Sequence, residues 1–448
     1  MKKILIALIF ASQAAFGASQ PHSVATEGKG AAPTDGYTPP IIGNGSICTS
    51  VDYLGGQTQR KYVNYFPEVV WAGRRTNLPF TSLSTMGHFE CEISVDGAPL
   101  GEPISWRQTL NTTEAYTECE VEYASATVKT VAFVPYGYDM LVVKKTVAPK
   151  SGGAKTADVK FKYKFTDKDS TYPPARTIMR QRQYEAQPNS ASLFYRIFGH
   201  KDYNGEISAT SSAPAKVITD NTSITLESHF DLSKGDATSA YFVTYADDFN
   251  KGNREKNSAA LKKYISEKGF EGIFSDHKQN WKNFWGNEFV SLPDAPMQDA
   301  YQTGLYHLRT VCTKWSFPVG LMGHGAAWSG RFFGFDEMFA QSGAVSAGKF
   351  DISVRTPNFR KDLLPVAMRR VQHYSDNSIK KFGARYAWES LEDGSEGAPN
   401  PAGFWIDHVF HMANIANSCW KHYLYTGDKK FLEETAYPVI RECAAFYY

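Results

Sequence analysis

An alternation of apolar and polar residues, running from Ile41 to about Asp247, constrains the fold of this chain most strongly. It is clearest at 126–134, 140–147, 159–165 and 239–245. Side chains on a β-strand point to opposite faces in turn, so this period of two predicts half-buried strands separated by Gly, Pro, Asn and Asp turns. So many strands can bury their inner faces only when two sheets pack together. The sequence therefore predicts an antiparallel β-sandwich.

The pattern becomes helical near Asn257. Helices are predicted at 258–268 and 273–285, where Trp281, Phe284 and Trp285 share one apolar face, and again at 298–314. Later segments are mostly helical with Gly-rich joints. At Thr426-Gly427-Asp428, Gly427 can end one helix in a left-handed conformation and Asp428 can cap the next.

The N-terminus has the pattern of a secretion signal. Lys2 and Lys3 precede a short apolar run at 4–10, and the small residues Ala15 and Gly17, with Phe16 between them, fit a cleavage site. We expect residues 1–17 to be a signal peptide and residues 18–40 a flexible leader, and the protein to be secreted or periplasmic. No later apolar stretch is long enough to span a membrane.

The C-terminal segment 431–448 is amphipathic and stops without a capping residue. A helix with an aromatic last turn normally continues into a partner element, so we expect a C-terminally truncated version of a longer protein. The predicted domains are a β-sandwich at 41–255, a helical linker at 256–297 and a partial helical domain at 298–448.

Composition excludes several functions. The 48 Lys and Arg residues nearly balance the 46 Asp and Glu residues, giving a net charge of +2. No basic field therefore argues for nucleic acid. The 6 Cys residues lack zinc-ligand spacing. The sequence is compatible with one disulfide among Cys48, Cys91 and Cys119, and equally with buried free thiols.

Two aromatic and acidic segments carry the candidate chemistry, at 328–339 (WSGRFFGFDEMF) and 383–390 (GARYAWES). Each brings carboxylates together with flat rings near a helix end. Sugar hydroxyls are bound well by charged acceptors, and the apolar faces of a pyranose rest on aromatic rings. The pattern is compatible with a carbohydrate site, and also with rings that fill a core and acids that start a helix.

Six segments in order resemble glycoside hydrolase family 65, the maltose, trehalose and kojibiose phosphorylases and related α-glucosidases. They are Ile42-Gly43-Asn44-Gly45, the helix with His277, Trp281, Phe284 and Trp285, Tyr306-His307-Leu308, Gly330 to Phe339, Tyr386 to Ser390, and Trp420 with Tyr423 and Thr426-Gly427-Asp428. The resemblance implies an α+β multidomain fold, with a β-super-sandwich followed by the first half of an (α/α)6 barrel that binds sugar at its mouth.

The resemblance also implies site residues. The family's sugar-binding Trp-Asp pair corresponds to Phe335 and Asp336 here, with Phe in place of Trp, which keeps stacking but loses an N–H donor. The alternative for Asp336 is an N-cap for a helix beginning near Met338. The family's general acid lies in a Gly-Pro-Asp-Glu segment that is absent here, so we expect that acid beyond Tyr448.

Four further residues are candidates for substrate contact. Trp388 is either a sugar platform or a core residue, and Glu389 is a candidate hydrogen-bond acceptor. Arg331 either orients a carboxylate or forms a structural salt bridge. Glu396 either contacts substrate or is a solvated acid of the loop that follows. Glu337 is expected to be a first-turn helix acid.

Asp407, His411 and Asn414 share one predicted helix face, next to His408. A complete ligand set at metal spacing is missing, so we expect a polar face and no metal or cofactor.

The sequence thus predicts an exported glycoside hydrolase that acts on α-linked glucosides by an inverting acid/base mechanism. Its partner is an oligosaccharide or glycoside; a homodimer is among the options. The alternatives are a phosphorylase of the same family, a non-catalytic exported carbohydrate-binding protein, and an (α/α)6-barrel enzyme of α-fucosidase or rhamnosidase type. The chain as given should be inactive alone.

Overall fold

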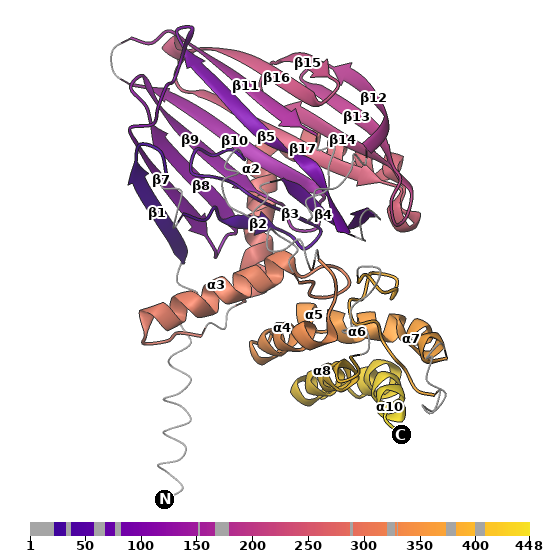
Figure 1. Cartoon of the computed structure of the whole chain (residues 1–448). Helices are drawn as coiled ribbons and strands as arrows, with labels where there is room; N and C mark the ends of the chain where they lie inside the picture. Colours follow the sequence, from indigo (N-terminus) through magenta and orange to yellow (C-terminus); the bar gives the residue numbers. More distant parts are fainter. Residues whose placement is uncertain are drawn as a thin grey trace, which may run out of the picture.

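The computed structural model describes residues 22–32, 37–57, 68–76, 82–150, 153–165, 179–286, 290–319, 328, 330–372, 382–398 and 408–448. Two antiparallel sheets are followed by helices (Figure 1). This confirms the predicted order of strands and then helices. That the helices form the first half of an (α/α)6 barrel stays a prediction.

The larger sheet has nine strands in the order β1-β7-β8-β9-β10-β17-β14-β13-β12. Their bounds are β1 Ser23–Lys29, β7 Ser105–Asn111, β8 Tyr116–Glu122, β9 Ala126–Phe133, β10 Met140–Pro149, β17 Ala237–Asp247, β14 Tyr203–Ser211, β13 Ser190–Ile197 and β12 Met179–Gln187. The second sheet has eight strands, ordered β15-β16-β11-β5-β4-β3-β2, with β6 paired to β5. These are β15 Lys216–Asp220, β16 Ser223–Asp231, β11 Thr156–Lys164, β5 Ser82–Val95, β4 Val69–Thr76, β3 Ile47–Ser50, β2 Ile41–Gly43 and β6 Ala98–Pro99.

Aromatic side chains join the two sheets. The ring of Phe161 on β11 stacks on Tyr241 of β17, with centroids 4.3 Å apart, and on Phe89 of its own sheet at 5.4 Å. Nearby, the hydroxyls of Tyr163 and Tyr245 are hydrogen-bonded at 2.7 Å across the same interface. All five side chains are buried in one core, so the alternation in the sequence marks residues that face this shared interior.

The prediction of a flexible leader at 18–40 is wrong for residues 23–29. This segment is strand β1, which pairs with β7 along its whole length from Ser23↔Asn111 to Lys29↔Ser105. Its side chains are almost all exposed. An edge strand held mainly by backbone hydrogen bonds, here with one exposed Glu27–Arg107 pair, has no apolar alternation, so composition does not reveal it. Residues 1–17, the predicted signal peptide, lie outside the described residues.

The linker helix α2 (Arg254–Trp285) packs on the outer face of the nine-stranded sheet. Ile265 and Ile273 contact Phe133, Val142 and Phe242 there. The helix is interrupted at Gly269, whose φ of 55° is not helical. The two helices predicted for this region are therefore the two arms of one broken element.

The remaining helices lie beyond the sandwich (Figure 1). They are α3 (Ala295–Val311), α4 (Gly334–Ser346), α5 (Phe350–Ser353), α6 (Arg355–Asp362), α7 (Leu364–Val371), α8 (His411–Thr426), α9 (Lys429–Phe431), the π-helical turn η4 (Leu432–Ala436) and α10 (Tyr437–Ala445). Helices α4 and α8 pack tightly, since a Cβ on Gly334 would lie 2.9 Å from Ile415. As predicted, Gly427 is left-handed at φ 65°, and the Asp428 side chain accepts the Phe431 N–H at 3.0 Å.

All six cysteines are free thiols, and five of them are buried. Of the two compatible readings of the sequence, the structure thus shows buried thiols and no disulfide. Among the described helices, none combines the length and the apolar character needed to cross a membrane.

Candidate functional site

The two aromatic and acidic segments meet at the start of α4. Phe332 and Ser390 exchange backbone hydrogen bonds of 2.9 and 3.0 Å, and Ser390 forms a further bridge to Glu396. These short β-type contacts hold residues 388–397 against the entry of α4. Sequence segments more than 50 residues apart are thereby placed side by side.

Behind this contact lies a buried ion pair between Arg331 and Glu389. The Arg331 side chain is fully buried and that of Glu389 is 8% exposed. Burial raises the pKa of Glu389, with the neighbouring Arg331 acting in the opposite direction. This ion pair agrees with both alternatives for Arg331, the orientation of a carboxylate and a structural salt bridge. Glu389 faces this arginine and not solvent.

Glu396 also stabilises this loop, through hydrogen bonds to its backbone. Its carboxylate accepts the backbone N–H of Trp388 at 3.1 Å and that of Glu389 at 2.9 Å. A carboxylate with two backbone donors fixes the course of the chain at Trp388. Substrate contact by Glu396 stays a prediction beside this supporting role.

The sandwich also holds the loop. Arg75 of β4 forms a bidentate pair with Glu392, at 2.8 and 2.7 Å, and its guanidinium donates to the carbonyl of Gly330 at 2.7 Å. Both side chains are buried. One arginine of the sandwich therefore contacts both segments of the candidate site.

A second buried pair underlies α4. Glu337 and Arg360 have fully buried side chains, and Arg360 Nε donates to Glu337 Oε2 at 2.9 Å. Burial raises the pKa of Glu337, against the effect of the adjacent arginine. Glu337 does lie in the first turn of α4, as predicted, but its role is to fix α4 against α6.

Trp388 is the centre of an aromatic cluster that lies at the N-terminal ends of α4 and α8. Its ring centroid lies 5.5 Å from Phe333, 5.5 Å from Phe410, 4.8 Å from His408 and 5.3 Å from His411. The side chain is only partly buried. Trp388 thus combines contacts to core neighbours with a ring surface open to a ligand.

Phe335 and Asp336 lie on the exposed side of this cluster. The Phe335 ring is 40% exposed and makes edge contacts with Phe339 and Phe410, at 5.0 and 5.8 Å. Asp336 is exposed in the first turn of α4, where partial desolvation raises its pKa. The helix begins at Gly334 and has no side-chain cap. The alternative of Asp336 as an N-cap for a helix near Met338 is therefore wrong.

The polar face predicted on α8 is present at His411 and Asn414. His411 is buried, and its Nε2 hydrogen-bonds the Tyr386 carbonyl at 3.0 Å. Burial lowers its pKa to about 3, so the ring is neutral at physiological pH. Within the described residues, His411 Nδ1 and Asn414 Nδ2 are buried without a hydrogen-bond partner. His408 lies beside Trp388, and Asp407 is outside the described residues.

Over the described part of the chain, no three His, Cys, Asp or Glu side chains are grouped closely enough to hold a metal ion. What the geometry offers instead is an exposed carboxylate, partly open aromatic rings and unsatisfied polar atoms on α8. Buried polar groups without partners are uncommon and are often completed by a ligand or water. Such a surface can bind a polyhydroxylated ring.

Sequence reasoning missed the residues that support this surface. Arg75, Arg360 and Phe410 lie far along the chain from their partners. An arginine with no local acidic partner gives no signal of its own. Phe410 directly precedes α8, and an aromatic residue at such a position cannot be told from a core residue by the sequence pattern.

Relatives of this chain are carbohydrate-active proteins. Two kojibiose hydrolases, from Flavobacterium johnsoniae and Mucilaginibacter mallensis, are each 26% identical to it over 194 and 187 residues. A kojibiose phosphorylase from Halothermothrix orenii is 26% identical over 199 residues. These alignments cover 41%, 40% and 40% of this chain, but only 26%, 26% and 24% of the respective relatives.

Solved structures show the same fold. A protein assigned as a kojibiose phosphorylase from the human microbiome matches with a TM-score of 0.71 at 13% identity, covering 96% of this chain and 60% of that one. A bacterial glucoamylase complexed with acarbose matches with a TM-score of 0.51 at 10% identity, covering 94% and 61%. The chain thus spans about three fifths of these structures.

A family comparison adds one local match. Residues 393–448 match the family described as the glycosyl hydrolase family 95 catalytic domain. The chain is thus similar in part of its sequence, and in fold, to glycoside hydrolases and phosphorylases. Several of these relatives are named for kojibiose. Membership of family 65 itself stays a prediction, because the family match is to family 95 and covers only the C-terminal helices.

Proposed function

We propose that this chain is part of an exported glycoside hydrolase that acts on α-linked glucosides with inversion. The observation that carries the proposal is the surface formed by Phe335, Asp336 and Trp388, where the N-terminal ends of α4 and α8 meet. The similarity to kojibiose hydrolases supports the substrate class. The pattern of residues 1–17 supports export.

In this proposal, the rings of Trp388 and Phe335 hold the apolar face of the terminal glucosyl unit. Asp336 accepts hydrogen bonds from adjacent hydroxyls, each contributing about 1.5–3 kcal/mol. Glu389, Arg331 and Glu396 keep Trp388 in place. His411, with its pKa of about 3, is neutral and serves as a hydrogen-bonding group and not as a proton donor.

Inversion requires a carboxylic acid that protonates the glycosidic oxygen and a carboxylate that activates water, with roughly 6.5–9.5 Å between them. Of the described carboxylates near the surface, Glu337 and Glu389 are committed to buried arginines. We therefore assign sugar binding to Phe335, Asp336 and Trp388 and a supporting role to Glu337 and Glu389, and we assign the acid and the base to none of them.

Binding is measured by titration calorimetry of the chain with kojibiose. We expect Asp336→Asn and Trp388→Ala each to weaken binding at least tenfold. Asp236→Asn, at an exposed aspartate of the sandwich, is the matched control and should have no effect. Unchanged affinity in both site variants would refute the assignment of this surface.

The reaction is tested with kojibiose and other α-linked glucose disaccharides, with and without inorganic phosphate. Glucose release that needs no phosphate supports hydrolysis, and β-glucose as the first anomer seen by NMR supports inversion. A sugar phosphate formed only with phosphate present moves the assignment to a phosphorylase, which the similarity to kojibiose phosphorylases favours as the second candidate. Binding without either product agrees with a carbohydrate-binding protein and equally with the predicted inactivity of this chain on its own.

A further inference from the structure

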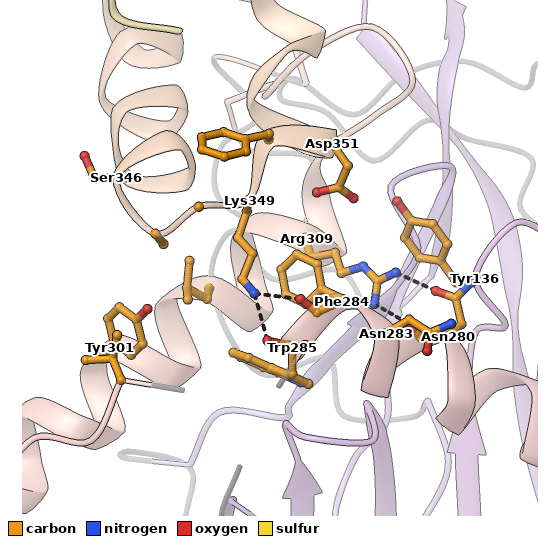
Figure 2. A pocket seen from close by; sticks show the side chains of 17 residues that line it. Tyr136, Asn280, Asn283, Phe284, Trp285, Tyr301, Arg309, Ser346, Lys349 and Asp351 are labelled. Carbon is orange, nitrogen blue, oxygen red and sulfur yellow. Dashed lines mark hydrogen bonds between the residues drawn. The ribbon is translucent and has the colours of Figure 1, made fainter. Parts of the chain in front are cut away.

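A large cavity lies away from the surface just described, at the opposite end of α4. It has a volume of about 1360 Å³ and is bounded by the end of α2, by α3, and by the segment from the end of α4 into α5 (Figure 2). Ser346, which lines it, is ten residues along α4 from Asp336, which corresponds to about 15 Å of helix. The cavity is therefore a separate site.

The two cations in its wall are already engaged by protein groups. Lys349 Nζ donates to the carbonyls of Phe284 and Trp285 at 2.6 and 3.1 Å, at the C-terminal end of α2. The guanidinium of Arg309 lies 4.1 Å from the ring centroid of Tyr136 and 4.4 Å from that of Phe284. Burial lowers its pKa to about 10. Both cationic side chains are thus held in the wall by carbonyl groups and rings of the protein.

The groups that remain available are neutral polar groups, one acid and aromatic faces. Asp351 is exposed, and its charge acts to raise the pKa of Arg309 and of Arg355 nearby. Asn283 is exposed, with its carbonyl oxygen bound by Gln279. The ring of Tyr301 is half-buried and that of Phe350 is 40% exposed. Figure 2 shows Tyr301 and Asp351 on opposite sides of the cavity.

We propose that this cavity is a second binding site for a neutral oligosaccharide. A carboxylate and an amide provide acceptors and donors for hydroxyls, and the rings of Tyr301 and Phe350 provide surfaces for the faces of pyranoses. The volume exceeds the roughly 300–1,000 Å³ of a site for one small molecule, so it has room for several linked sugar rings. The inference rests on the proposed function for its ligand class, and it adds a site that anchors longer substrates.

The test is titration calorimetry of the full chain with maltoheptaose, a neutral α-glucan oligosaccharide. We expect two classes of site. Tyr301→Ala and Asp351→Asn should each weaken one class at least tenfold and leave unchanged the class that Trp388→Ala removes. Asp236→Asn should change neither. Asp351→Asn replaces an exposed side chain, so folding does not obscure the result if Tyr301→Ala is unstable.

The remaining outcomes separate the two proposals. A single class of site that Trp388→Ala abolishes, and that neither cavity variant affects, overturns this inference and leaves the proposed function in place. A single class that depends only on Tyr301 and Asp351 supports the cavity. An absence of all binding overturns this inference, and in both cases the titration with kojibiose decides on the site at Trp388.

Discussion

Replacing Glu337 by Gln should loosen the base of the candidate site. The side chains of Glu337 and Arg360 are both fully buried, and they satisfy one another's charge. Gln keeps the shape of Glu but removes its charge, so Arg360 would remain as a buried cation without a counter-charge. Breaking such a pair costs about 3–5 kcal/mol. We expect the free energy of opening α4 and α6 to fall by that amount.

Native-state hydrogen exchange followed by mass spectrometry measures this opening directly. Each 1.4 kcal/mol corresponds to a tenfold change in an equilibrium constant, so amides of α4 and α6 should exchange roughly a hundredfold to several thousandfold faster. Peptides from the sandwich strands, such as β11 and β17, serve as the internal reference and should be unaffected.

A double variant, Glu337→Leu with Arg360→Met, provides the decisive comparison. Replacing both members of a buried pair by apolar residues is often neutral or stabilising, so protection of α4 should return. Exchange in Glu337→Gln within threefold of the unmodified chain would refute the reasoning. So would a double variant that is no better protected than the single one.

Two further predictions use chemical denaturation. Burial lowers the pKa of His277 to about 4 and that of His411 to about 3, so both are neutral when folded. Their contribution to stability is complete above the unfolded pKa of about 6.5 and is lost as the pH falls toward these values, by about 1.4 kcal/mol per pH unit for each residue. His411→Gln should reduce the slope of stability between pH 6.5 and 4.5, and an unchanged slope would contradict this. Gly304→Ala should stabilise α3 by about 0.5–1 kcal/mol, because Gly304 is exposed within the helix and has open space around it. Gly427→Ala should destabilise by about 1–2 kcal/mol because its φ is 65°; equal effects of the two changes would show that backbone conformation is not the cause.

Local rules predicted the features that depend on a few consecutive residues. Gly427 and Asp428 end and start helices as expected, because a left-handed stop and a side-chain cap are properties of two or three positions. The strands of the sandwich followed from their period. The start of α4 was placed at Met338 and lies at Gly334, since no capping side chain marks it.

The supporting contacts of the candidate site could not be predicted in this way. Arg75 and Glu392 are separated by 317 residues, and Arg360 and Glu337 by 23. Which charged residues form ion pairs depends on how the sandwich and the helices pack. A local sequence pattern does not contain this information. The same holds for Trp388, whose neighbours come from α4, α8 and the segment that precedes α8.

The grip of Arg75 on Glu392 and Gly330 has a consequence for how such proteins can change. Deleting the sandwich, or replacing it by one from a distant relative, would leave the carboxylate of Glu392 buried without its arginine partner. The loop that carries Trp388 would then lose its contact with β4. The sandwich therefore helps to position the candidate site. Substitution of Arg75 on β4 would therefore change the position of the loop that carries Trp388 without changing any residue that we propose to bind sugar.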